Sequence, residues 1–283
     1  MWKRPIFALA GPDGGDNVYR LSFMNTDRIQ QLAEIVDAAA MDLKEIDMLT
    51  SSAGGLTIEQ AYDVQEASLA RRMARGERLV GMKMGLTSRA KMEQMGVHEP
   101  IYGRLTSAMI VNDGALIDLA DYLHPRIEPE IAFIMGRDLA GPTTPAQALD
   151  AVSGVCAALE IIDSRYRDFK FTLPDVIADN TSAVRFVLGG SLVQAKKTNL
   201  GNLGIVMTVN GRVVATGSSA AVLEHPARSL AELVTMLARR GERLEAGQVV
   251  LSGGATVAMA LNAGDHVRVE IDEIGSAEVR VAG

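Results

Sequence analysis

The stretch HPRIEPEIAFIM, residues 124–135, has the apolar composition of a buried strand and yet carries two glutamates. Side chains alternate along an extended chain, so Glu128 and Glu130 emerge on the same face, about 6.6–6.8 Å apart. Pro129 points to the other face and cannot donate a ladder hydrogen bond, which predicts an edge strand or a bulged strand. Two carboxylates so placed repel each other unless a cation lies between them. The pair therefore indicates a site beside this strand.

Other short β-like runs follow from Arg78 onward, each bounded by glycine. They read LVGMKMGL, AMIVN, VRFVLGG, GIVMTVNGRVVATG, GQVVLSGG and HVRVEID. Asn210-Gly211 between two alternating runs is the strongest hairpin signal in the chain. One helix is expected inside this region, with Ser229 and Glu232 as its capping box and its end near Gly241.

The N-terminal part of the chain has a different pattern. An amphipathic helix is expected from Thr26, and a second helix from Thr57, where Gln60 completes a capping box. Residues 1–23 lack helical periodicity and are expected to be an extension. The sequence predicts an α+β fold: an N-terminal extension and helical region over 1–77, then a β-rich body over 78–283, as one structural unit.

Composition restricts the class of protein. The chain has 283 residues, of which 48% are hydrophobic, and a net charge of −7. Its 28 Lys and Arg form no basic tract, which argues against a nucleic-acid partner. Cys156 is the single cysteine, so no internal disulfide can form, and a cytoplasmic location is expected. The longest uncharged window, 246–264, contains glycines and polar residues and is expected to be a strand, a turn and a strand rather than a membrane span.

A third carboxylate interrupts another apolar run. Glu160 lies in VSGVCAALEII, where a buried charge is costly without a partner. Three carboxylates from two apolar segments suit a hard divalent ion such as Mg²⁺ or Mn²⁺. The alternative is that Glu128 and Glu130 line a solvated strand face and that Glu160 is a capping residue. Zinc is disfavoured, because HExxH is absent and the four histidines are scattered.

Three further segments could contribute to such a site. Lys83 lies between Gly81 and Gly85, which would let backbone or a ligand come close, although a solvent-facing lysine on an edge strand is the alternative. Ser252, Gly253 and Gly254 could present backbone N–H groups and a hydroxyl to an anion, or form a plain turn. A charged segment after Glu160 is expected to be a solvated loop, which could also cover the site; its charged residues are Asp163, Arg165, Arg167, Asp168 and Lys170.

Five blocks of the sequence, in order, resemble the hydratase/decarboxylase family of the fumarylacetoacetate hydrolase superfamily. They read GMKMGLTSRAKMEQMGVHEPIYGRL, HPRIEPEIAF, ALEIIDSRYRDFKF, ADNTSAVRFVLGG and VVLSGGATVA. The likeness runs from about Thr26 to the C-terminus. It implies a mixed β-roll with a small helical N-terminal region.

The resemblance also implies roles for particular residues. Glu128, Glu130 and Glu160 match the glutamates that hold Mg²⁺ or Mn²⁺ in the family, and Lys83 matches its active-site lysine. The turn formed by Ser252, Gly253 and Gly254 matches the turn that receives the substrate carboxylate.

Two branches of the family compete for this sequence. Vinylpyruvate hydratases add water to 2-hydroxypenta-2,4-dienoate, whereas the decarboxylase branch makes that dienol by removing CO₂ from 2-oxohex-3-enedioate. Hydratases tend to have an aspartate where this chain has Ile101, and a tryptophan where it has Phe169. Both differences favour the decarboxylase branch, with Ile101, Phe169 and Phe171 as apolar walls around the departing carboxylate. The resemblance further implies a dicarboxylate substrate, a homo-oligomer and a complex with vinylpyruvate hydratase. The alternative to an enzyme is that the chain serves only as a non-catalytic partner of that hydratase.

Overall fold

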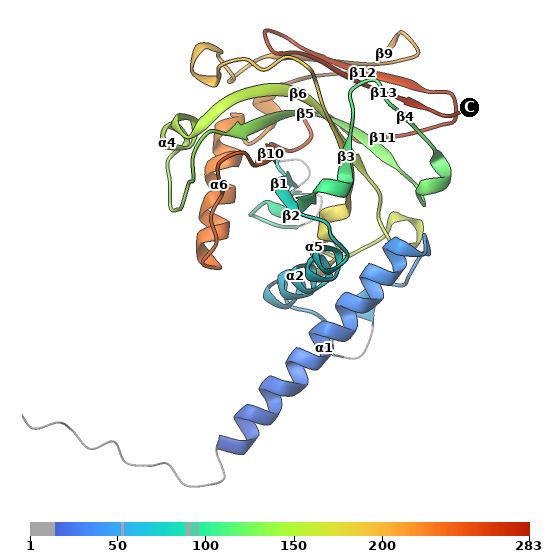
Figure 1. The fold of residues 1–283 in the computed structure, drawn as a ribbon, viewed down its shortest axis with the longest axis vertical. Helices are drawn as coiled ribbons and strands as arrows, with labels where there is room; N and C mark the ends of the chain where they lie inside the picture. Colours follow the sequence, from blue (N-terminus) through green and yellow to red (C-terminus); the bar gives the residue numbers. More distant parts are fainter. Residues whose placement is uncertain (1–14, 52–53, 89–91, 94–95) are drawn as a thin grey trace, which may run out of the picture.

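The computed structural model describes residues 15–51, 54–88, 92–93 and 96–283, with side chains from Thr26 onward. Two β-sheets form the body, and helix α1 extends away from it at the N-terminal end (Figure 1). The strands are β1 Leu79–Gly85, β2 Ile101–Thr106, β3 Ile110–Val111, β4 Leu116–Ile117, β5 Arg126–Met135, β6 Val152–Ile162, β7 Ala183–Leu188, β8 Gly204–Val209, β9 Arg212–Ser218, β10 Val249–Leu251, β11 Met259–Ala260, β12 His266–Ile271 and β13 Gly275–Val281. The described α-helices are α1 Gly15–Met41, α2 Ile58–Ala74, α4 Pro145–Asp150, α5 Leu173–Ala178 and α6 Pro226–Arg239.

The larger sheet holds β5 and β6 at its centre. Its strand order is β2-β1-β10-β5-β6-β7-β3, and β11 also pairs with β5. The second sheet has the order β4-β13-β12-β8-β9, and its strands β12 and β13 pack against β6. The apolar side chains between the sheets form one large core that extends to α2 and α6. The α+β class predicted from the sequence is confirmed. The strands β2, β4, β6 and β13 are not among the β-like runs that the sequence analysis singled out.

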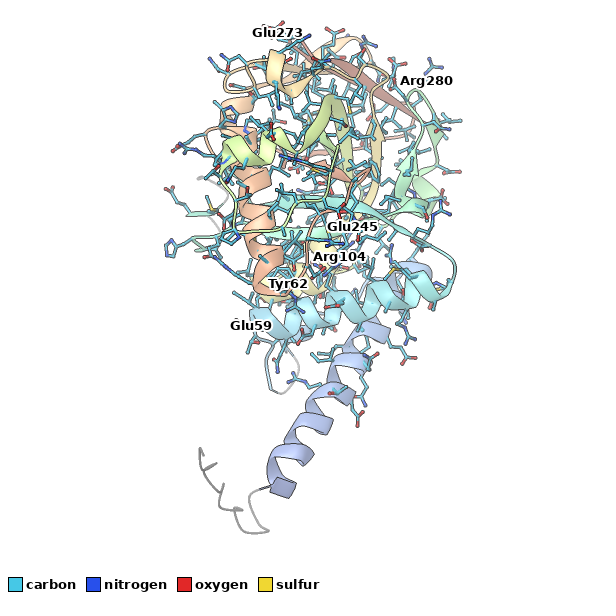
Figure 2. All side chains as sticks on the ribbon, turned by 60° about the vertical axis from the view of Figure 1, so that its left-hand side comes forward. Glu59, Tyr62, Arg104, Glu245, Glu273 and Arg280 are labelled. Carbon is cyan, nitrogen blue, oxygen red and sulfur yellow. The ribbon has the colours of Figure 1, made fainter. Side chains whose placement is uncertain are left out.

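Helices cover one end of the larger sheet. Figure 2 shows Tyr62 of α2 and Arg104 of β2 together near that end, far from Arg280 of β13 and from Glu273 in the turn between β12 and β13. The Tyr62 and Tyr102 rings stack with their centres 4.5 Å apart, which joins α2 to β2. None of the described helices is both long and apolar enough to cross a membrane.

Two of the expected helix starts are wrong. The first helix begins at Gly15, not near Thr26, so the helical pattern extends into the segment expected to lack it. The last long helix begins at Pro226 with His225 as its N-cap, because a proline is well suited to the first helical turn. Ser229 is therefore inside the helix, where its hydroxyl donates to the Ser252 carbonyl at 2.7 Å.

Several local predictions are confirmed. Thr57 and Gln60 form the capping box of α2. Asn210 and Gly211 have φ values of 51° and 76°, which suits the tight turn between β8 and β9. The 246–264 window contains β10 and β11 with a turn between them. Cys156 is a free buried thiol whose pKa is raised to about 11 by burial, so it behaves as a core side chain.

Candidate active site

Three glutamates meet on one face of the central strand pair. β5 and β6 run antiparallel, and the Cα atom of Glu128 is the direct partner of that of Glu160. Glu130 follows on the same face of β5, two residues along. One carboxylate oxygen from each lies within 4.8 Å of the others, and all three residues are buried. The structure thus brings together the three residues that the sequence predicts as metal ligands, and a solvated strand face is excluded.

Burial makes the charged form of these carboxylates costly. It raises the pKa of Glu130 well above its usual range, and the charge of Glu160 raises it further. Burial also raises the pKa of Glu160, although the ammonium of Lys83 opposes that shift. Like charges held together away from water repel strongly, so cations or protons must compensate for them.

The donor atoms of the cluster fit a divalent cation. Among the described residues, Oε1 of Glu130 and Oε1 of Glu160 are buried and have no hydrogen-bond partner. A buried carboxylate oxygen without a partner costs free energy, which an ion bound there would offset. All three side chains offer carboxylate oxygens, the donors that Mg²⁺ and Mn²⁺ prefer. The residues present therefore suit a hard ion.

Lys83 is buried beside the cluster. Its Nζ atom lies 2.9 Å from Oε2 of Glu160 and donates to the Thr181 carbonyl at 3.0 Å. β1 is paired on both sides, with β2 and β10, and the lysine side chain is 3% exposed, so a solvent-facing edge lysine is excluded. Its partner on β2 is Gly103, where a Cβ atom would come 2.6 Å from the Asn180 carbonyl oxygen and 3.1 Å from Lys83 Cδ. The glycine therefore accommodates the Asn180 backbone first, and the stem of Lys83 packs beside it.

The glycines that flank Lys83 serve backbone packing. A Cβ atom at Gly81 would lie 2.0 Å from the Val249 carbonyl oxygen, and one at Gly85 would lie 2.7 Å from Thr181 Cγ2. Such contacts cannot form without a shift of the backbone or of Thr181. The groups that come close to these two glycines are therefore the backbone of Val249 and the side chain of Thr181.

The turn formed by Ser252, Gly253 and Gly254 lies against the glutamates. The Gly253 N–H donates to Oε2 of Glu130 at 2.7 Å, and Gly253 has a φ of +104°, which favours glycine. A Cβ atom at Gly254 would lie 2.6 Å from Oε2 of Glu128. Ser252 is fully buried, and its hydroxyl has no hydrogen-bond partner among the described residues. The turn thus orients Glu130 and leaves space for Glu128, and its role toward a substrate carboxylate stays a prediction.

The sequence predicts an edge strand or a bulged strand at Pro129, but β5 is not an edge strand, and the irregularity in its pairing with β6 lies at Ile134–Met135. β5 pairs with β6 on one side and with β10 and β11 on the other. The missing N–H falls between β10 and β11, where the Pro129 carbonyl accepts from Ala255 at 3.2 Å. In an antiparallel ladder the N–H and C=O groups of one residue point to the same side of the strand. The backbone edge of Pro129 that lacks an N–H therefore faces the turn at 252–254. The proline is tolerated because the ladder is already interrupted there.

The three predicted apolar wall residues lie in two places. Ile101 is buried at the start of β2 and lines a cavity of about 700 Å³, with Ile58, Leu173 and Met236 among the other lining residues. None of the four charged cluster residues lines that cavity. Phe169 and Phe171 are half-buried, with ring centres 5.7 Å apart, in the segment after β6. The structure therefore pairs the phenylalanines and places Ile101 on another strand.

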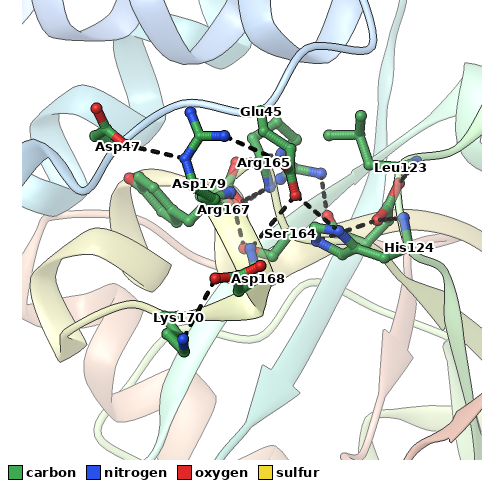
Figure 3. Close-up of polar contacts among 12 residues, drawn as sticks. Glu45, Asp47, Leu123, His124, Ser164, Arg165, Arg167, Asp168, Lys170 and Asp179 are labelled. Carbon is green, nitrogen blue, oxygen red and sulfur yellow. Dashed lines mark hydrogen bonds and ion pairs between the residues drawn. The ribbon is translucent and has the colours of Figure 1, made fainter.

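The charged segment after β6 is only partly solvated. Arg167, Asp168 and Lys170 are exposed, whereas Asp163 and Arg165 are buried, so the expectation of a solvated loop is wrong for these two. Asp163 accepts from the backbone N–H groups of residues 123 and 124. Arg165 forms an ion pair with Asp179, a buried aspartate directly after α5, as Figure 3 shows. These contacts hold the segment at a fixed place beside the start of β5.

Sequence analysis missed one residue on the face of the cluster. Arg126 precedes Glu128 by two positions at the start of β5, and the register of β5 with β6 is regular from 126 to 134. Its side chain is exposed, and its guanidinium carbon lies 4.4 Å from the centre of the Phe169 ring. The period of two that linked Glu128 to Glu130 was the signal that could have found it.

The fold and the site define a β-sheet protein with a buried centre of three carboxylates and one lysine. The family model for the fumarylacetoacetate hydrolase C-terminal region matches residues 76–282. The chain belongs to the fumarylacetoacetate hydrolase family.

Relatives with curated names fall into two groups. A 4-oxalocrotonate decarboxylase from a Pseudomonas species is 49% identical over 90% of this chain and 99% of its own. A 2-hydroxypent-2,4-dienoate hydratase from Pseudomonas putida is 37% identical over 77% of this chain and 99% of its own. The decarboxylase is thus the more similar of these two relatives.

A solved structure agrees with this grouping. The 4-oxalocrotonate decarboxylase from Pseudomonas putida G7, complexed with magnesium and adipate, is 41% identical with a TM-score of 0.88. The match covers 90% of this chain and 98% of that protein. The fold of the whole matched region is therefore shared.

Proposed function

We propose that this protein is a metal-dependent decarboxylase that converts 2-oxohex-3-enedioate, also called 4-oxalocrotonate, to 2-hydroxypenta-2,4-dienoate and CO₂. The observation that carries the proposal is the buried cluster of Glu128, Glu130 and Glu160 beside Lys83. Relatives named 4-oxalocrotonate decarboxylase, at 41–49% identity over about nine tenths of the chain, support this substrate over that of the hydratases.

The reaction determines what the site must do. When the C5–C6 bond breaks, CO₂ leaves from C6 and the electron pair remains at C5. That pair delocalises through C4 and C3 to the oxygen on C2, where a proton completes the dienol. The site must therefore stabilise negative charge at the C2 oxygen and deliver one proton there.

The cluster residues meet the first requirement. Glu128, Glu130 and Glu160 would hold Mg²⁺ or Mn²⁺, which when bound supplies positive charge to the C1 carboxylate and the C2 oxygen. Gly253 fixes the Glu130 carboxylate through its N–H group, so that ligand is oriented before any substrate arrives. Lys83 fixes Glu160 in the same way from the other side.

Lys83 is proposed to meet the second requirement. Its ammonium adds positive charge to a site from which water is largely excluded, where charge interactions are strong. It also carries the protons that the C2 oxygen needs. Ser252, Gly253 and Gly254 are proposed to receive the C1 carboxylate, with the free Ser252 hydroxyl as the donor that remains available.

An apolar surrounding for the C6 carboxylate would favour its loss as neutral CO₂. We assign this role to Phe169 and Phe171, because weak solvation destabilises the anion more than the transition state. Ile101, which lines a separate cavity, stays a predicted wall residue. Ile101 is buried and both phenylalanines are half-buried.

A second candidate function is hydration of 2-hydroxypenta-2,4-dienoate. It is favoured by the relatives named as hydratases at 34–37% identity, and the same electron sink would serve it. A role as the non-catalytic partner of a vinylpyruvate hydratase is a third candidate, and the complete charged cluster argues against it. A complex with such a hydratase, a homo-oligomer and a cytoplasmic location also stay predictions.

Ultraviolet absorbance tests the proposal directly. The purified protein is mixed with 2-oxohex-3-enedioate and, separately, with 2-hydroxypenta-2,4-dienoate, each with Mg²⁺ and with EDTA. Conversion of the diacid to the dienol with Mg²⁺, no conversion with EDTA and no loss of the dienol would establish the decarboxylase. Consumption of the dienol would identify a hydratase, and turnover of neither compound would overturn both.

A further inference from the structure

We infer that Arg126 is the specificity-determining residue that binds the distal, C6 carboxylate of the dicarboxylate substrate. This inference rests on the proposed function, which supplies the six-carbon diacid. Arg126 is a cation on the same strand face as the glutamates, and it has no role in the proposed decarboxylation step.

The placement of Arg126 follows from strand geometry. Arg126, Glu128 and Glu130 point to one face of β5, and no bulge interrupts the pairing of β5 with β6 between these positions. The Cα atoms of Arg126 and Glu128 are therefore separated by about 6.6–6.8 Å along the strand. The turn at 252–254 lies along residues 129–131, so Arg126 lies at the opposite end of the carboxylate cluster.

The length of the substrate matches this arrangement. Five C–C bonds separate the terminal carbons of an extended six-carbon diacid, which corresponds to about 6 Å. With C1 held beside Glu130 and the 252–254 turn, C6 comes level with Glu128, and the Arg126 side chain must span the remaining ~7 Å from its own end of β5. A monoacid bound in the same way would bring only a methyl or methylene group to that end.

The charge of Arg126 is available for a ligand. Among the described residues its guanidinium has no carboxylate partner, and its one recorded contact is with the face of Phe169. That contact lies 4.4 Å from the ring centre and leaves the edge of the guanidinium, which carries the N–H donors, open. Phe169 is packed against Phe171 and His124, so it holds the arginine at a fixed place.

The arrangement reconciles binding with loss of CO₂. Arg126 is exposed, so water screens its attraction for the carboxylate and the ground state is stabilised only modestly. Phe169 supplies an apolar surface beneath the same guanidinium. The arginine would therefore select the diacid through KM, whereas bond cleavage would depend on the cluster.

A matched pair of ligands tests the inference apart from catalysis. 2-Oxoadipate and 2-oxohexanoate share the 2-oxo acid end and differ only in the C6 carboxylate, and neither has the C3=C4 bond needed for CO₂ loss. Binding of each, with Mg²⁺, is measured by calorimetry on the wild type and on Arg126→Met, Arg126→Lys and Arg167→Met. Arg167 is an exposed arginine close to Phe169, so its variant controls for net charge.

We expect Arg126→Met to bind 2-oxoadipate about fivefold more weakly and 2-oxohexanoate unchanged, as for an exposed ion pair. Arg126→Lys should keep part of the preference and Arg167→Met all of it. With 2-oxohex-3-enedioate, Arg126→Met should raise KM about fivefold and keep kcat within about twofold. Equal weakening of both ligands, or a lower kcat with unchanged KM, would overturn the inference. Failure of the wild type to turn over the diacid would instead count against the proposed function.

Discussion

Replacement of Lys83 by methionine should destabilise the metal-free protein strongly. The ammonium lies 2.9 Å from Glu160, and the exposed fractions of the two side chains are 3% and 1%. At that distance the attraction is about 6 kcal/mol for an effective dielectric constant of 20. Removal of one partner from a buried pair typically costs about 3–5 kcal/mol, because the other charge stays buried. We take about 3 kcal/mol, since partial protonation of the cluster relieves some repulsion.

Urea unfolding in EDTA at pH 7.5 measures this effect. With a slope of about 3 kcal/mol per molar urea, the midpoint should fall by about 1 M. Lys170→Met is the control, because Lys170 forms an ion pair with Asp168 in which both side chains are exposed, and its midpoint should barely change. Added Mg²⁺ should restore much of the stability of Lys83→Met by binding to the folded state.

The pH dependence gives a second test of the same reasoning. Loss of Lys83 removes the effect that lowers the pKa of Glu160, so that pKa rises further above its unfolded value. A carboxyl whose pKa is higher in the folded state than in the unfolded state binds more protons when the protein is folded. The stability of the protein therefore increases as the pH falls toward the pKa of the unfolded state. The difference between Lys83→Met and the wild type should therefore shrink between pH 7.5 and pH 5. Equal midpoints in EDTA at pH 7.5 would refute the reasoning.

Three further predictions concern the site. Gly254→Ala should weaken Mg²⁺ binding at least about tenfold by calorimetry, because its Cβ atom would lie 2.6 Å from Glu128; Gly190→Ala, where no atom lies within 4 Å of the added Cβ, is the control. The affinity for Mg²⁺ should decrease from pH 8 to pH 6, because raised pKa values at Glu130 and Glu160 let protons compete with the ion. Ile101→Asp should lower kcat for the diacid at least about tenfold and leave Mg²⁺ affinity within about twofold, because it adds a charge to the apolar surrounding and not to the cluster.

Each of these has a contrary result. Wild-type Mg²⁺ affinity in Gly254→Ala would show that Glu128 can adjust without cost. A pH-independent affinity would mean that the metal-free carboxylates hold no protons in that range. A loss of Mg²⁺ binding in Ile101→Asp that matches its loss of turnover would remove Ile101 from the substrate pocket.

The sequence by itself determined which side chains share one face of β5 and that these side chains are carboxylate donors. Glu128 and Glu130 share a face because side chains alternate, whatever the rest of the chain does. The capping box at Thr57 and the turn at Asn210 were also readable, because both are formed by neighbouring residues. Such local rules need no knowledge of distant contacts.

Only the tertiary structure decided which residues meet at that face. Glu160 joins the pair because β5 and β6 align it opposite Glu128, and strand register depends on contacts far apart in sequence. Lys83 meets Glu160 because β1, β10, β5 and β6 follow one another in one sheet, a strand order that the order of residues in the chain does not contain. Pro129 was predicted to lie on an edge or a bulged strand for the same reason: the gap between β10 and β11 that accommodates it is formed by residues more than a hundred positions later.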